Sequence, residues 1–139
     1  MSKIIIIGAG AMGSAFALPC IDNKHDVNIV GTHLENDFID SLKAKENFHP
    51  GLNVKLDKKI KFHKFDNFNN LLNNSADLIV LGISSKGIEW VSEQLCKIFK
   101  NKNIPNLLML TKGLSIFNNN YELLVDKLKR LLSENGINK

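Results

Sequence analysis

Three glycines near the start of the chain have the spacing that diphosphate binding requires. They lie in the segment Gly8-Ala9-Gly10-Ala11-Met12-Gly13, which follows an apolar run over residues 4–7 and opens a stretch of small residues. The first glycine allows a tight turn, the second lets the backbone approach a diphosphate, and the third lets helix and strand pack closely. Backbone amides at the positive end of the helix dipole then hold the anion. We therefore predict that this loop binds NAD(H) or NADP(H).

The end of the second predicted strand bears on the choice between the two cofactors. Proteins that bind NAD usually place an Asp or Glu about 20 residues past the loop, for the ribose hydroxyls. Here the stretch reads Gly31-Thr32-His33, and the first acid, Glu35, follows slightly late. The side chains of Thr32 and His33 can donate to a 2′-phosphate. We therefore expect either cofactor to bind, with a slight preference for NADP.

Apolar runs alternate with amphipathic stretches along the whole chain. Runs rich in Ile, Val and Leu, most of them ended by glycine, predict buried strands over residues 4–7, 27–30, 78–81 and 107–110, with a weaker strand over 60–63. Helices are predicted over 11–21, where Pro19 should kink or shorten the helix, and over 68–72. Asn36 and Asp37 can cap a helix that carries Phe38, Ile39 and Leu42.

Two further amphipathic helices are expected in the second half of the chain. Their apolar residues recur at helical spacing and comprise Ile88, Val91, Leu95, Ile98 and Phe99 in one helix, and Tyr121, Leu124, Val125, Leu128, Leu131 and Leu132 in the other. The Asn-rich stretches 67–74 and 118–120 are predicted to be loops or helix ends.

Such alternation predicts an α/β fold, a Rossmann-type, doubly wound, mostly parallel sheet with helices on both faces, forming one domain over residues 1–139. Ligands of such sheets bind at the carboxyl ends of the strands. Four segments are expected there: the glycine loop, Gly31-Thr32-His33, Gly82-Ile83-Ser84-Ser85 and Thr111-Lys112-Gly113.

Composition argues against several other classes of protein. The net charge of +4 is mild, and the lysines between residues 55 and 64 are interrupted by Asp57 and apolar residues, so no nucleic-acid surface is expected. Cys20 and Cys96 stand far apart, which favours two buried reduced thiols and no metal site. No secretory signal and no apolar run of about 20 residues is present, so we expect a cytoplasmic chain without a membrane span.

Several segments together resemble the amino-terminal domain of NAD(P)-dependent glycerol-3-phosphate dehydrogenase. The glycine loop with Ser14-Ala15 is similar to that family's GAGxxGTA opening, and Asn47-Phe48-His49-Pro50-Gly51 to its N-x-x-Y-L-P-G segment. Ala76-Asp77-Leu78-Ile79-Val80 resembles a strand of the family, and Thr111-Lys112-Gly113-Leu114 matches its Thr-Lys-Gly turn. The segments occur in the family's order and spacing over nearly the whole chain.

The resemblance implies a role for particular residues. Ala11 and Met12 would contact the cofactor diphosphate through their backbone, and Thr32 would lie at the adenosine ribose, where the family usually has Arg or His. Lys112 would contact both the cofactor and sn-glycerol 3-phosphate. The implied reaction moves hydride between glycerol 3-phosphate and dihydroxyacetone phosphate in phospholipid synthesis, and the family is compatible with a homodimer. The expected cofactor-binding residues are Gly8, Gly10, Ala11, Met12, Gly13, Thr32, His33, Ser84 and Lys112.

The chain also departs from the family. His49 replaces the usual Leu, and Ser84-Ser85 replace Pro-Ser or Pro-Thr. The family's proton-accepting lysine lies in a carboxyl-terminal helical domain that would begin near Lys139. His25, His49 and His63 are expected in turns or at strand edges and pair with no evident acid. We therefore expect no catalytic residue in this chain, and cofactor binding without turnover.

Two other interpretations remain open from the residues alone. A domain of the ketopantoate reductase type has a similar GxGxMG opening, but it leaves the Thr-Lys-Gly turn unexplained. A stand-alone nucleotide-sensing regulatory domain has a suitable length, but such sensors typically carry an acid at the end of the second strand, which this chain lacks.

Overall fold

The computed structural model describes residues 1–138 and divides them into two compact units. The first unit comprises residues 1–82 and 105–110, and the second comprises residues 83–104 and those from 111 onward. The prediction of a single domain over residues 1–139 stays a prediction. Within the described part of the chain, every helix is too short or too polar to cross a bilayer.

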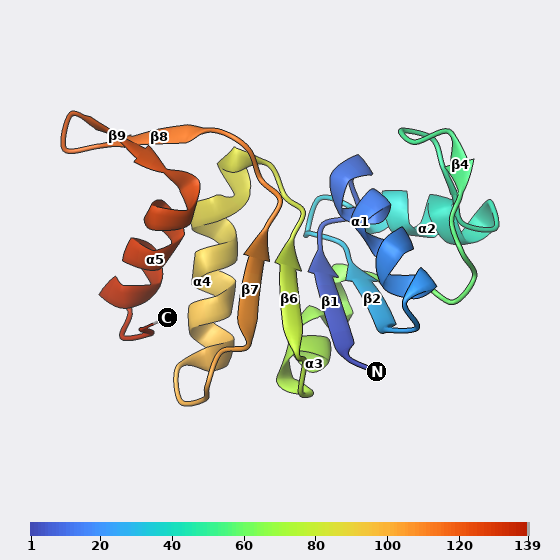
Figure 1. Cartoon of the computed structure of the whole chain (residues 1–139), viewed down its shortest axis with the longest axis horizontal. Helices are drawn as coiled ribbons and strands as arrows, with labels where there is room; N and C mark the ends of the chain where they lie inside the picture. Colours follow the sequence, from blue (N-terminus) through green and yellow to red (C-terminus); the bar gives the residue numbers. More distant parts are fainter. Residues whose placement is uncertain (139) are drawn as a thin grey trace. The chain divides into compact units, whose positions relative to one another are not determined.

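A five-stranded parallel sheet forms the centre of the first unit. Its order is β5-β2-β1-β6-β7, with strands Lys3–Ile7 (β1), Asp26–Val30 (β2), Lys61–His63 (β5), Leu78–Leu81 (β6) and Asn106–Met109 (β7). Figure 1 shows β2, β1, β6 and β7 side by side and pointing the same way. The chain passes from β1 outward to β5, then returns to the other side of β1, so the order reverses between β1 and β6. This arrangement confirms the predicted Rossmann-type sheet.

The central strands β1 and β6 are buried on both faces, which explains the unbroken apolar runs over residues 4–7 and 78–81. Ile4 and Ile6 of β1 point to one face, Ile5 and Ile7 to the other, and all four are buried. The prediction that β7 is buried was wrong, because its residues are exposed or only half-buried. As the outermost strand, β7 has a neighbouring strand on one side only.

Helices α1 (Ala11–Asp22) and α2 (Asn36–Ala44) cover one face of this sheet. Ala17, Cys20 and Ile21 of α1, and Ile39 and Leu42 of α2, share one apolar core with alternate residues of the strands. Helix α3 (Phe68–Asn73), which follows the 3₁₀ turn η1 (Phe65–Asn67), crosses from β5 back to β6 in the opposite direction. A right-handed crossover in that direction lies on the other face.

Two local predictions in this unit were wrong, the shortening of α1 at Pro19 and the capping of α2 by Asn36, whereas a kink at Pro19 stays a prediction. Pro19 does not shorten α1, which continues to Asp22 because Cys20 and Ile21 are buried against the sheet and Asn23 closes the helix with bonds to the Pro19 carbonyl. Asn36 does not cap α2: Glu35 precedes the helix, and the Asn36 side chain instead accepts the Phe65 N–H at 2.9 Å.

A small hairpin in the first unit was not predicted. Strands β3 (Phe48–His49) and β4 (Val54–Lys55) pair antiparallel around the Pro50-Gly51 turn. Each strand has only two residues, too few to give an alternating pattern in the sequence. The hairpin nevertheless positions His49, which proves to be part of the site.

The second unit contains helix α4 (Ile88–Phe99), preceded by the 3₁₀ turn η2 (Ser85–Gly87), and helix α5 (Leu124–Glu134). The two helices pack together, and the exposed carboxylate of Glu89 pairs with Lys127 at 2.9 Å. Strands β8 (Leu114–Phe117) and β9 (Asn120–Leu123) form a hairpin that leads into α5. Figure 1 shows the hairpin running directly into this helix.

The β8–β9 hairpin corrects the prediction for Tyr121, while Asn118 and Asn119, predicted to lie in a loop or helix end, form its turn. Tyr121 was expected on a helix but lies in β9, where it is 81% exposed. Asn118 and Asn119 both adopt positive φ, at 49° and 61°, which is the backbone of a tight hairpin turn that favours asparagine. The Asn118-Asn119 pair, which follows Phe117 and precedes Asn120-Tyr121, was the signal in the sequence that could have predicted the hairpin.

Candidate functional site

The glycine loop lies between β1 and α1 at the carboxyl edge of the parallel sheet. Gly8 has φ +100°, a conformation that L side chains rarely adopt, and its N–H donates to the Val30 carbonyl at 2.9 Å. A Cβ on Gly13 would lie 2.7 Å from the Gly8 oxygen, and one on Gly82 would lie 2.9 Å from Gly13 Cα. Helix α1 can therefore begin this close to β1 and β6 only because these residues lack side chains.

The beginning of α1 is open enough to accept an anion. A Cβ on Gly10 would meet no atom within 4 Å, and Met12 is 51% exposed. Within residues 1–138, no side chain caps the first turn of α1. The first turn of a helix presents unbonded amides and the positive end of the dipole. Because Gly10 leaves room and the amides are not capped, this loop fits a diphosphate.

The peptide groups on either side of Ala9 are held by three side chains, which we call the Ala9 clamp: Ser14, Glu35 and His49. The Ala9 N–H donates to the carboxylate of Glu35, at 3.2 Å to Oε1 and 3.4 Å to Oε2. The Ala9 carbonyl accepts a hydrogen bond from Ser14 Oγ at 3.1 Å, and His49 Nε2 lies 3.0 Å from it. Both polar groups of Ala9 are therefore satisfied by side chains.

None of the three clamp residues was predicted to belong to the site, and two of them, Glu35 and His49, lie far from the loop in the sequence. Glu35 was set aside because it comes late after β2, but Gly31 allows the chain to turn back, since a Cβ there would lie 3.2 Å from Glu35 Cβ. His49 lies at the end of β3 beside a turn, as expected, but its burial was not foreseen: only 2% of it is exposed. The only hint in the sequence was a histidine where the resembling family has leucine.

Thr32 is linked to the glycine loop by the carboxylate of Glu35, which bonds both Thr32 and Ala9. Its N–H donates to Glu35 Oε2 at 2.7 Å, while its hydroxyl accepts the Leu34 N–H at 3.4 Å. His33 is exposed, and its ring lies edge-on to Phe65 with centroids 6.0 Å apart. Of the two residues predicted to bind the ribose, Thr32 is therefore connected to the loop. The connection is made by its backbone N–H and not by its hydroxyl.

Ser84 and Lys112, the other predicted site residues, belong to the second unit. There Thr111 Oγ1 donates to the Ile83 carbonyl at 2.7 Å, and a Cβ on Gly113 would lie 3.9 Å from Ser85 Cβ. The Thr-Lys-Gly turn therefore lies beside the segment that carries Ser84. Lys112 is exposed, and no acidic side chain within residues 1–138 pairs with its ammonium group.

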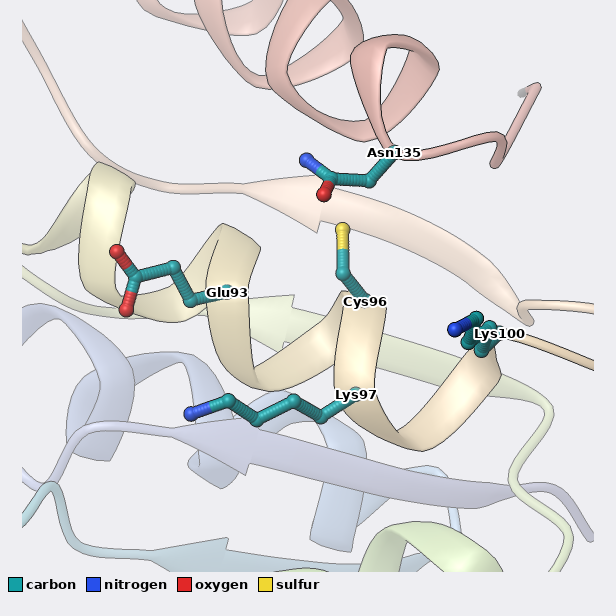
Figure 2. Close-up of a pocket in the computed structure, with 5 residues that line it drawn as sticks. All are labelled: Glu93, Cys96, Lys97, Lys100 and Asn135. Carbon is teal, nitrogen blue, oxygen red and sulfur yellow. The ribbon is translucent and has the colours of Figure 1, made fainter.

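A surface groove of about 300 Å³ in the second unit involves none of the predicted site residues. Figure 2 shows its lining residues, with the Cys96 thiol pointing toward the side chain of Asn135. Burial raises the pKa of the Cys96 thiol, so this cysteine lacks the thiolate character of a nucleophile. Within the described residues, no three His, Cys, Asp or Glu side chains are grouped so as to hold a metal ion.

The reversal of strand order at β1, with an open glycine loop beside it, defines the first unit as a Rossmann-type dinucleotide-binding fold. The sequence profile of the family described as "NAD-dependent glycerol-3-phosphate dehydrogenase N-terminus" matches residues 3–138. The chain belongs to this family.

Curated relatives agree with that assignment. The NADP(+)-dependent glycerol-3-phosphate dehydrogenase of Archaeoglobus fulgidus is 34% identical over 116 residues, which cover 84% of this chain and 33% of the relative. Glycerol-3-phosphate dehydrogenase [NAD(P)+] of Bacillus pumilus is 33% identical over 115 residues, covering 82% and 31%. The chain thus spans about a third of the length of these relatives.

Solved structures show the same fold. Glycerol-3-phosphate dehydrogenase from Coxiella burnetii superposes with a TM-score of 0.74 at 22% identity, covering 94% of this chain and 38% of that one. The enzyme from Plasmodium falciparum gives the same TM-score, identity and coverage. At this level of identity, the likeness supports the fold alone.

Proposed function

We propose that this chain is the cofactor-binding part of an NAD(P)-dependent sn-glycerol-3-phosphate dehydrogenase. Membership of the family carries the proposal, and the open glycine loop at the switch point of the sheet supports it. The whole protein would interconvert glycerol 3-phosphate and dihydroxyacetone phosphate, a step that feeds phospholipid synthesis. The ketopantoate reductase and nucleotide-sensor interpretations have no comparable support, since neither is the family that matches.

The first unit supplies the groups that bind the cofactor diphosphate. The backbone amides of Ala11 and Met12 lie in the uncapped first turn of α1, and Gly10 leaves the space in front of them open. The dipole of α1 adds a partial positive charge at this end. Bound nicotinamide supplies hydride chemistry, whereas the chain's own task here is to bind and orient the diphosphate.

The second unit supplies the group proposed to bind substrate. The Lys112 ammonium is exposed and without an acidic partner among residues 1–138, so it is available to a phosphate or a developing oxyanion. Thr111 anchors the turn that carries it. We propose that Lys112 contacts the phosphate substrate, and that Ser84, on the neighbouring segment, contributes to the cofactor site.

Three finer points belong to the same proposal. The chain alone should bind cofactor without turning over substrate, because the two bases beside the loop, Glu35 and His49, are both engaged by backbone groups of the first unit. The slight preference for NADP rests on Thr32 and His33, while the carboxylate of Glu35 beside Thr32 opposes a 2′-phosphate by charge. A cytoplasmic location and a homodimer stay predictions from the sequence and the resemblance.

A single substitution at Gly10 tests the cofactor site. Gly10 has φ −65° and open space around it, so Gly10→Asp should fold, and aspartate is a favourable residue before a helix. Its carboxylate would occupy the anion site and repel the diphosphate. We expect saturating NADH or NADPH, at about 100 times Kd, to stabilise the wild type by about 2.7 kcal/mol and the variant not at all.

Thermal unfolding with and without each nucleotide measures both effects. Gly10→Ala is the matched control, because it adds a side chain without charge and should retain at least part of the stabilisation. If neither nucleotide at millimolar concentration raises the Tm of the wild type, the chain is not a dinucleotide-binding domain.

A further inference from the structure

We infer that His49 is a positioning residue for the dinucleotide loop, holding the Ala9–Gly10 peptide so that the amides of the loop face the diphosphate. This inference rests on the proposed cofactor-binding function. It concerns a residue at which the chain departs from the resembling family, where leucine is usual and cannot donate a hydrogen bond.

The His49 ring is fixed from several sides. The Leu52 N–H donates to Nδ1 at 3.2 Å, so Nδ1 acts as an acceptor and the ring carries its proton on Nε2. Nε2–H then donates to the Ala9 carbonyl at 3.0 Å. The edge of the ring contacts Phe38, with centroids 5.3 Å apart at an interplanar angle of 81°. A buried ring with both nitrogens bonded has one orientation available.

The direction of the Ala9 carbonyl sets the direction of the next amide. Every peptide bond described is trans, so the Ala9 carbonyl and the Gly10 N–H of the same peptide plane point in opposite directions. His49 and Ser14 hold the carbonyl inward, where Ala9 is fully buried. The Gly10 N–H must therefore point away from the clamp, and Gly10 lies on the open side of the loop.

The preceding peptide is fixed in the same way. The Ala9 N–H is held by Glu35, so the Gly8 carbonyl of that peptide points in the opposite direction, toward Gly13. The clamp thus holds two successive peptide planes of the loop before any ligand arrives. Preorganised donors bind more tightly because their ordering does not have to be achieved on binding.

His49 also ties the β3–β4 hairpin to the loop. A Cβ on Gly51 would lie 3.2 Å from His49 Cε1 and 3.9 Å from the Cβ of Ala11, the first residue of α1. The Pro50-Gly51 turn therefore lies against both the ring and the start of the helix. The short β3–β4 hairpin is therefore packed against the glycine loop through its turn.

Nucleotide affinity of His49 variants tests the inference on the full chain. His49→Leu removes the donor but keeps an apolar side chain, and we expect its Kd for NADH to rise about five- to tenfold, as loss of one hydrogen bond's net strength predicts. His49→Gln restores an N–H donor of similar reach, so its Kd should stay within about twofold of the wild type. Isothermal titration calorimetry well below each Tm measures the folded protein only.

A second histidine provides the matched control. His25 accepts the Ser2 N–H at the start of β2, the opposite end of the sheet from the loop. His25→Leu should lower stability without changing the Kd. If His49→Leu binds NADH as tightly as His25→Leu does, or if His49→Gln fails to recover affinity, His49 is a packing residue and the inference is wrong.

Amide hydrogen exchange separates this inference from the proposed function. If the wild type binds neither NADH nor NADPH, the proposed function fails, but the loop can still be examined in the free protein. Faster exchange over residues 8–13 in His49→Leu, with exchange elsewhere unchanged, supports the positioning role. Exchange equal to that of the wild type overturns it.

Discussion

At the scale of single residues, the glycines of the loop perform different tasks. Gly8 adopts a positive φ, Gly10 leaves open space in front of α1, and Gly13 allows α1 to pack closely against β1. Only the third is required for packing between elements, because its missing Cβ would meet a backbone oxygen that cannot move aside. The fold and the binding site thus depend on different glycines of one motif.

Substitution of two of these glycines by alanine should separate packing from binding. Gly13→Ala places a Cβ 2.7 Å from the Gly8 oxygen, and overpacking of this kind costs about 1–3 kcal/mol of unfolding free energy. Gly10→Ala meets no neighbour and should leave stability within about 0.5 kcal/mol. Urea unfolding of both variants checks this, and equal stabilities would show that α1 can shift away from β1.

At the scale of elements, the edge strand β5 is attached to β2 by a chain of polar side chains. His63 Nε2 bonds Asn28 Oδ1 and His63 Nδ1 bonds Asn67, each at 3.0 Å. Lys61, also on β5, pairs with Asp26 at 2.8 Å. Because Asn28 is buried within the sheet, its hydrogen bonds matter more to stability than those of an exposed amide would.

This network should make stability depend on pH. Burial, and then the nearby Lys43 and Lys61, lower the pKa of His63 below its usual 6.5, while Asp26 opposes them. The unfolded chain therefore binds a proton that the folded chain does not, so the contribution is fully present above pH 6.5 and is lost as pH falls through the lower folded pKa. The slope for one group cannot exceed about 1.4 kcal/mol per pH unit, and solvent screening of this half-exposed ring reduces it.

The His63→Gln variant removes this titration while keeping an amide that can bond Asn28. Its unfolding free energy should fall less than that of the wild type between pH 7 and pH 5, as measured by denaturant unfolding at each pH. Parallel curves for the two proteins would assign the acid sensitivity to other groups. Protonation of Asp26 affects stability only at lower pH, because its hydrogen bond with Lys61 lowers its pKa from the usual 3.8.

At the scale of the whole molecule, the chain spans about a third of the length of its curated relatives. A role for Lys112 in binding substrate is therefore best tested in a full-length relative, at the lysine of the matching Thr-Lys-Gly turn. Replacing that lysine by alanine should raise the KM for glycerol 3-phosphate at least tenfold, because a charged hydrogen bond to phosphate is lost. Its Tm should change little, since Lys112 is exposed here.

Steady-state kinetics with both substrates give the needed comparison. The KM for the nucleotide should rise less than the KM for glycerol 3-phosphate if the ammonium mainly contacts the substrate. An unchanged KM for glycerol 3-phosphate would reduce Lys112 to a solvated surface lysine.

The sequence by itself determined the five strands of the parallel sheet, the main helices and their order, but not the β3–β4 and β8–β9 hairpins. Runs such as residues 4–7 and 78–81 are apolar at every position because a parallel strand is buried on both faces, so burial is visible in composition alone. The glycine loop was equally visible, since its spacing reflects local backbone geometry. The segments missed were those whose conformation is set by few residues, such as the two-residue strands β3 and β4.

Only the tertiary structure decided the partners of Ala9. Glu35 and His49 lie 26 and 40 residues away along the chain, and no local pattern encodes that they converge on one peptide group. Their convergence depends on how α2 and the β3–β4 hairpin pack beside the loop. Periodicity reports which face of an element is buried, whereas the identity of a hydrogen-bond partner depends on distances that exist only once the elements have packed.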